Sequence, residues 1–141
     1  MTGDELIAHF EGGTTAPETF HHADHVRLGY EYLTRYPVLD ALQKFSAALL
    51  RFATAQGKAD RYHETVTWAY LFLIRERLLA GTQPSDWESF AARNADLLAW
   101  AKGSFGVLDR YYQQGTLASA AARASFLLPD RPLKINQTVR P

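Results

Sequence analysis

The sequence of 141 residues contains no cysteine. This absence excludes disulfide bonds, catalysis by a thiolate and zinc sites built from cysteine. It leaves His, Asp and Glu as the expected protein ligands of a metal ion. Neither sign of charge is in excess, because 15 Lys and Arg residues stand against 15 Asp and Glu residues. We therefore expect no broad phosphate-binding surface and no nucleic acid as the main partner.

Long apolar runs are missing as well. No apolar stretch approaches the length that crosses a membrane, and the acidic segment Met1 to Glu5 lacks the basic start and apolar run of a signal peptide. We therefore expect a cytoplasmic protein that has no membrane partner.

Strand patterns are nearly absent, whereas apolar residues recur at helical spacing almost throughout the chain. Hydrophobic residues make up 47% of the sequence, which is long enough to bury one core. The sequence therefore predicts an all-α fold, a single helical-bundle domain over residues 1–141 with about five to seven helices.

Glycine, proline and capping residues delimit the predicted helices. The main helices are predicted over residues 4–11, 16–35, 37–56, 61–80 and 86–100, with shorter pieces over residues 107–113 and 116–126. Thr15 and Ser85 are the predicted N-caps of two capping boxes, and Asp60 is the predicted N-cap of helix 61–80. This helix is apolar on nearly every side, which predicts a central position. Residues 129–141, which have prolines at positions 129 and 132, are predicted to form an extended C-terminal tail.

Four of the five histidines lie near two predicted helix starts: His21, His22 and His25 near the first, and His63 near the second. Residues three apart share a helical face, so His22 and His25 are predicted to point the same way. Short loops make consecutive helices antiparallel, so the two helices, separated by one other, are predicted to begin at the same end of the bundle. The sequence therefore predicts that His22, His25 and His63 lie close together.

Two histidines from one helix and a third from another are typical of an open metal site. Zinc, iron or manganese would suit His22, His25 and His63, with water in the remaining positions. Glu64 and Asp24 adjoin these histidines and are the predicted catalytic residues, which would orient water or a substrate proton. The alternative for each histidine is structural, as a capping residue or a neighbour of the core.

A second interpretation uses the same end of the bundle without a metal ion. Helix N-termini carry free N–H groups and a partial positive charge, which favour a phosphate or a carboxylate. Arg27 and Arg61 would add positive charge. Tyr32, on the helical face that holds His25, and Thr67, in the later helix, are predicted to line the ligand pocket.

Three segments resemble a family of small bacterial helical proteins that has no secure activity. They are residues 20–26, FHHADHV; residues 62–67, YHETVT; and residues 126–131, FLLPDR. The similarity extends over most of the chain. The resemblance implies a bacterial origin and a shared site, but no particular reaction.

The first functional hypothesis is a small metal-dependent enzyme that acts on a small molecule by hydrolysis or oxidation. The alternative is a metal-free module that binds a small anionic or aromatic ligand, as a sensor or accessory protein. A purely structural or interaction protein is the third hypothesis, and a homodimer stays open as an assembly. The sequence does not choose between an enzyme and a binding protein.

Overall fold

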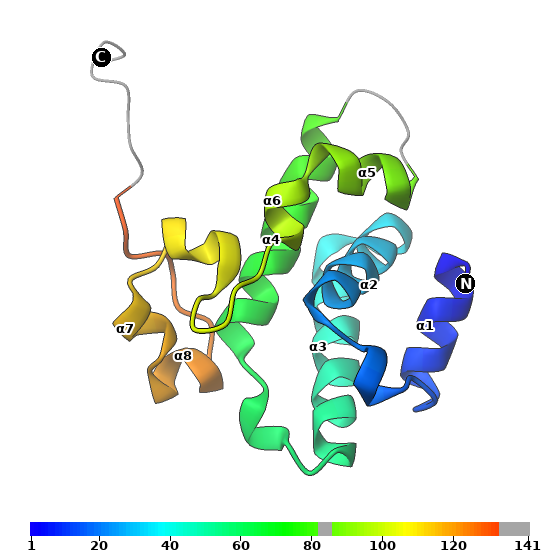
Figure 1. Cartoon of the computed structure of the whole chain (residues 1–141), viewed down its shortest axis with the longest axis horizontal. Helices are drawn as coiled ribbons and strands as arrows, with labels where there is room; N and C mark the ends of the chain where they lie inside the picture. The colour runs from blue at the N-terminus through cyan, green and yellow to red at the C-terminus, as the bar shows by residue number, and fades with distance from the viewer. Residues whose placement is uncertain (82–85, 133–141) are drawn as a thin grey trace.

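The computed structural model describes residues 1–81 and 86–132, and it confirms the predicted all-α fold (Figure 1). No strand occurs within these two ranges. The first part of the chain forms the longer helices, α1 (Gly3–Glu11), α2 (His22–Arg35), α3 (Val38–Ala55) and α4 (Glu64–Ala80). The later part forms the short helices α5 (Trp87–Arg93), α6 (Ala95–Leu98), α7 (Gln114–Leu117) and α8 (Ala120–Ala124). Within the described ranges, no helix is both long and apolar enough to cross a membrane.

Helix α4 is the central helix, as its apolar sequence predicts. It contacts α2 and α3 on one side and α8 on the other (Figure 1). Gly29 of α2 lets the two helices approach closely, because a Cβ atom there would lie 2.9 Å from Leu71 Cδ2 and 3.2 Å from Ile74 Cδ1. The α2–α4 pair is therefore the centre of the fold, and most of the other helices pack against it.

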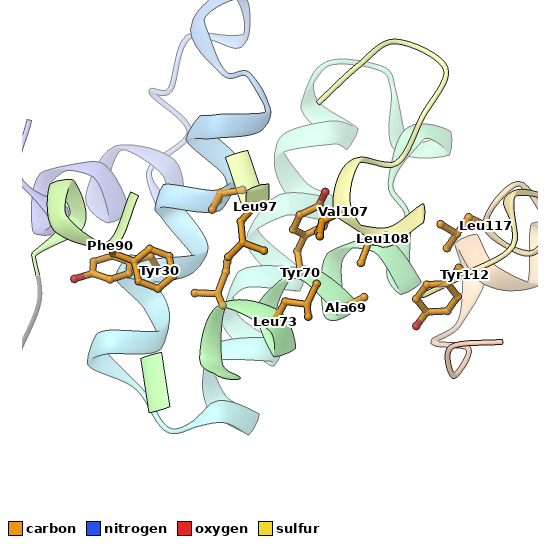
Figure 2. Packing of buried hydrophobic residues seen from close by; sticks show 12 residues of the cluster. Tyr30, Ala69, Tyr70, Leu73, Phe90, Leu97, Val107, Leu108, Tyr112 and Leu117 are labelled. Atoms are coloured by element: carbon orange, nitrogen blue, oxygen red, sulfur yellow. The ribbon is translucent and has the colours of Figure 1, made fainter. Parts of the chain in front are cut away.

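Two apolar clusters flank this helix pair. One joins α1, α2 and α3 and contains Leu28, Tyr32 and Phe45. The other runs along α4 and joins α2 to the later elements (Figure 2). In Figure 2, Tyr30 contacts Phe90 of α5 at one end of this cluster, with ring centroids 5.0 Å apart. Burying one such large apolar side chain contributes about 1.5–3 kcal/mol, so the two clusters are the main source of stability.

The start of α2 differs from the prediction. The Thr15 capping box does not form, and a single 3₁₀ turn, η1 (Pro17–Thr19), precedes the helix. The helix begins at His22, where the backbone N–H of His21 donates to Asp24 Oδ2 at 2.9 Å. The prediction was wrong because the Asp24 carboxylate satisfies this N–H group and so fixes the helix start later in the chain.

The start of α4 also lies later than predicted. Asp60 does not cap the helix but belongs to the 3₁₀ turn η2 (Ala59–Arg61). The N-cap is His63, whose Nδ1 accepts the backbone N–H of Val66 at 3.1 Å. Asp60 was predicted because carboxylate and hydroxyl oxygens are the usual caps. Here an imidazole nitrogen takes that place, which is the capping role that the sequence left open for each histidine.

The later helices are shorter and more often interrupted than predicted. Helix 86–100 is divided into α5 and α6 at Asn94, whose side chain donates to the carbonyl of Phe90 at 2.9 Å and competes with the helical ladder. Asp86 caps α5 by accepting the N–H of Ser89 at 2.8 Å. The predicted cap Ser85 lies outside the described residues.

The shorter predicted pieces also take a different form. Residues 107–113 overlap the 3₁₀ helix η3 (Gly106–Arg110), and residues 116–126 contain the end of α7 and all of α8. The described start of the predicted tail, residues 129–132, is held in place, because the N–H groups of Asp130 and Arg131 donate to the carbonyl of Tyr111 at 3.1 and 2.9 Å. The rest of the predicted tail, residues 133–141, lies outside the described residues.

Candidate functional site

The first turns of α2 and α4 border the same pocket, which has a volume of about 630 Å³. This volume suits a small organic molecule. Its lining comes from α2, α3, η2, α4, the segment between α6 and η3, and α8: His22, His25, Val26, Phe45, Leu49, Asp60, Arg61, His63, Val66, Thr67, Tyr70, Leu71, Ile74, Trp100, Phe105 and Arg123. The structure therefore brings His22, His25, His63 and Thr67 to one pocket.

His22 is both a pocket residue and a structural one. Its Nε2 lies 2.9 Å from the carbonyl oxygen of Leu97, and because a carbonyl only accepts, this nitrogen carries the proton. The ring stacks on Trp100 at a centroid distance of 4.5 Å and meets Tyr70 edge-on at 4.9 Å. Burial lowers the pKa of His22, and the hydrogen bond to Leu97 opposes this only in part. The ring is therefore neutral at pH 7.

His25 has a different environment. Its ring stacks on Phe20 with the centroids 4.1 Å apart. Within the described part of the chain, neither ring nitrogen has a hydrogen-bond partner, although the side chain lines the pocket. Burial and, to a smaller extent, the neighbouring His22 lower the pKa of His25 to about 4, although Asp24 opposes the shift. A neutral imidazole, with one donor and one acceptor, is thus available to a ligand.

His63 has both ring nitrogens engaged. Nδ1 accepts the N–H of Val66 as the cap of α4, and Nε2 donates to the carbonyl of Leu117 at 2.6 Å. Burial lowers the pKa of His63, the nearby charge of Arg123 lowers it further, and the hydrogen bond to Leu117 opposes both effects. His63 therefore connects α4 to α7 as a neutral ring.

The predicted metal site does not fit the geometry of His63. Its Nδ1 lone pair is occupied by the Val66 N–H, and its Nε2 carries a proton, so a metal ion could bind only if one of these hydrogen bonds broke. Across residues 1–81 and 86–132, no three or more His, Asp or Glu side chains are grouped to hold a metal ion. Metal binding by His22, His25 and His63 stays a prediction.

Neither predicted catalytic carboxylate lines the pocket. Glu64 accepts a hydrogen bond from the hydroxyl of Tyr62. Asp24 caps α2 instead, through the N–H of His21. A catalytic role for either residue stays a prediction that the pocket geometry does not support.

Two of the three predicted ligand-binding residues also lie elsewhere. Tyr32 is fully buried in the cluster between α1, α2 and α3, and its hydroxyl donates to Glu11 Oε2 at 2.6 Å. Arg27 donates to Glu31 Oε2 at 3.4 Å and to the carbonyl of Met1 at 2.8 Å, which ties α2 to the start of α1. Tyr32 was assigned from its helical face and Arg27 from its charge near the helix start, but the helix packing places both outside the pocket lining. Thr67 does line it, with its hydroxyl donating to the carbonyl of His63 at 2.7 Å.

The positive charges of the pocket come from Arg61 and Arg123. Arg61 was predicted to add charge here, whereas Arg123 was missed. In the ranges that the structure describes, neither guanidinium forms an ion pair or a hydrogen bond. One carboxylate, Asp60, shares the lining with them. The sequence held a weak signal for Arg123, since it is the only charged residue between Arg110 and Asp130.

The pocket thus combines three environments. Its walls are largely apolar and aromatic, its three imidazoles are uncharged, and its two arginines are unpaired within the described chain. This combination can hold an anionic group and an apolar body at the same time.

Comparisons of the chain with protein-family models, with curated proteins and with solved structures gave no match. The resemblance to small bacterial helical proteins stays a prediction. The site therefore has to be interpreted from its own geometry.

Proposed function

We propose that the protein binds a small organic anion with an apolar or aromatic body in this pocket, and that a metal ion is not required. The observation that carries the proposal is the pair Arg61 and Arg123, two guanidinium groups that are unpaired in the described chain and outnumber the single carboxylate of the lining, Asp60. This is the metal-free alternative that the sequence left open.

A guanidinium group donates two parallel hydrogen bonds to a carboxylate, and hydrogen bonds to charged groups contribute about 1.5–3 kcal/mol each. The N-terminus of α4, at His63, adds partial positive charge on the same side. Leu71 and Ile74 would cover an apolar body, at about 25 cal/mol for each Å² removed from water. These contributions favour an acid with a hydrocarbon or aromatic body over a bare inorganic anion.

Isothermal titration calorimetry with phenylpropionate and its neutral counterpart phenylpropanol tests the proposal. We expect the acid to bind more tightly than the alcohol. Arg61→Gln and Arg123→Gln should each weaken the acid about tenfold, since one charge-assisted hydrogen bond contributes at least 1.5 kcal/mol. Neither change should affect the alcohol. Arg75→Gln is the matched control, because Arg75 is an exposed arginine of α4 outside the pocket lining. Equal binding of acid and alcohol, or full affinity in the double arginine variant, would overturn the proposal.

The metal-dependent enzyme is the second candidate, because three histidines line the pocket. Elemental analysis of untagged protein purified without chelator tests it, beside the variant His25→Ala, which removes the histidine whose ring nitrogens are both unpartnered in the described chain. A near-stoichiometric first-row metal that is lost in this variant would support the enzyme. Our proposal expects the affinity for the acid to survive chelation.

A further inference from the structure

We propose that the ligand carries, besides its anionic group, an uncharged O–H or N–H group that hydrogen-bonds His25 in a part of the pocket separate from the arginines. This inference rests on the proposed function and specifies the ligand class. The preferred molecules would be acids with an apolar body and a hydroxyl or similar polar group at the other end, such as hydroxyaryl acids.

The first support is the unused hydrogen-bonding capacity of His25. Its ring is packed against Phe20, yet neither nitrogen has a partner in the described chain, and the side chain lines the pocket. His22 and His63 differ, because each donates its Nε2 proton to a backbone carbonyl. A polar group in a largely apolar pocket costs free energy unless it is paired, so a ligand that pairs His25 gains affinity.

The second support is the separation of charge along the pocket. Arg123 acts on His63, where its charge lowers the pKa of the ring. The charged or titratable neighbours that act on His25 are His22 and Asp24, both on α2, and no arginine is among them. From α3, Phe45 and Leu49 line the pocket and bring no charge. The anionic group of a ligand is therefore drawn to the arginines, and an uncharged polar group to His25.

The third support is the chemistry of a neutral imidazole. It offers one acceptor nitrogen and one N–H donor, so a hydroxyl group can donate to it or accept from it. Val26, Leu71 and Ile74 supply apolar lining from α2 and α4 against which the body of the ligand can pack. A hydroxyaryl acid satisfies the three environments together.

The experiment compares para-hydroxyphenylpropionate with para-methylphenylpropionate, which has nearly the same shape but no O–H group. By calorimetry on the wild type, we expect the hydroxyl compound to bind about three- to tenfold more tightly. His25→Phe should abolish or reverse this preference, because it keeps an aromatic ring against Phe20 and removes both nitrogens. Arg123→Gln should weaken both compounds by the same factor and leave the preference unchanged.

Two outcomes separate this inference from the proposed function. If neither acid nor phenylpropionate binds the wild type, the proposed function fails and this inference fails with it. If the acids bind but the wild type does not prefer the hydroxyl compound, or His25→Phe keeps the preference, this inference alone is overturned. Should His25→Phe not fold, the imidazole nitrogen chemical shifts of wild-type His25, measured by NMR, decide: the hydroxyl compound must move them and the methyl compound must not.

Discussion

The long-helix region, residues 3–80, and the C-terminal region, residues 86–132, are stabilised in different ways. The long-helix region packs continuous apolar faces, with Leu28 and Leu71 almost fully buried between its helices. The C-terminal region consists of short pieces whose backbone is held by polar side chains of α2 and α4. Four hydroxyl or imidazole groups donate to carbonyls there: His22 to Leu97, His63 to Leu117, Thr65 to Ser125 and Tyr70 to Phe105. We call these four hydrogen bonds the ties.

The difference shows that a polar residue on α2 or α4 can have a structural role, a role in the pocket, or both. Short helical pieces leave many carbonyls without an intrahelical partner, and buried carbonyls have to be satisfied by side chains. His22 and His63 do this work, whereas His25 does not. Of the three histidines predicted to form a site, His22 and His63 therefore also have the structural role that the sequence left open.

The largest expected effect concerns the packing of the long-helix region. Leu28→Ala should lower the free energy of unfolding by about 3–4 kcal/mol, because the side chain is fully buried and leaves a cavity. Leu39→Ala is the control: Leu39 is 74% exposed, and we expect a change within about 0.5 kcal/mol. Urea unfolding followed by circular dichroism measures both. Similar losses for the two variants would contradict the packing account.

Acid should lower the free energy of unfolding. The folded pKa of His25 is about 4, below its ordinary value of 6.5, so the unfolded state binds the proton first as the pH falls. Stability is complete above pH 6.5 and is lost as the pH falls toward 4, by about 2–3 kcal/mol for His25. His22 and His63 have lowered pKa values and add losses of the same sign.

Urea unfolding at several pH values between 4 and 7 measures this loss. His25→Phe should flatten the pH dependence of the free energy of unfolding, since it removes the histidine whose pKa is lowered most on folding. An unchanged slope in this variant would refute the assignment.

Breaking one tie should have an intermediate effect. The hydroxyl of fully buried Thr65 donates to the carbonyl of Ser125 at 2.7 Å and accepts the N–H of Leu127 at 3.1 Å. Thr65→Val keeps the shape but leaves both groups unpaired, and we expect a loss of about 2 kcal/mol. Hydrogen exchange should quicken at the Leu127 amide.

Thr54→Val supplies the comparison. Thr54 is exposed and donates only to Leu50 within α3, at 2.7 Å, so its loss should be a few tenths of a kcal/mol. If Thr54→Val and Thr65→Val destabilise equally, the ties do not stabilise the C-terminal region.

The smallest effect is expected at the ion pair that joins α4 to α6. Arg77 lies 2.8 Å from Asp96 and is partly buried, whereas Arg110 lies 3.5 Å from the same carboxylate and is 67% exposed. Arg77→Met should cost about 1 kcal/mol, and Arg110→Met should cost nothing measurable. The melting temperatures of the two variants, compared with that of the wild type, test this difference. Equal melting temperatures for the variants would show that this ion pair does not contribute to the junction.

The sequence predicted most of the long-helix region because apolar spacing reports directly on helix packing. The ends at Glu11, Arg35 and Ala80 agree with the structure. The starts of α2 and α4 were missed because Asp24 and His63 supply caps that the simple capping patterns do not describe.

The position of the site could be predicted from the topology, but its full set of residues and hydrogen bonds could not. Parallel placement of two helix starts predicted that His22, His25 and His63 would lie close together, and all three line the pocket. Arg123 could not be placed, because its position depends on how α8 packs against α4. The hydrogen bond from His63 Nε2 to the carbonyl of Leu117 could not be foreseen either, since this carbonyl is distant in sequence.

The ties have a consequence for the order of folding. The residues joined from His63, Thr65 and His22 are separated by 54, 60 and 75 positions in the chain. Closing such long loops is entropically costly, whereas the first region can build up through the pairs α1–α2, α2–α3 and α3–α4, which are consecutive in the chain. We expect the long-helix region to assemble first and the C-terminal region to dock in a later kinetic step. Because docking completes the pocket, a bound ligand should slow undocking far more than it accelerates folding.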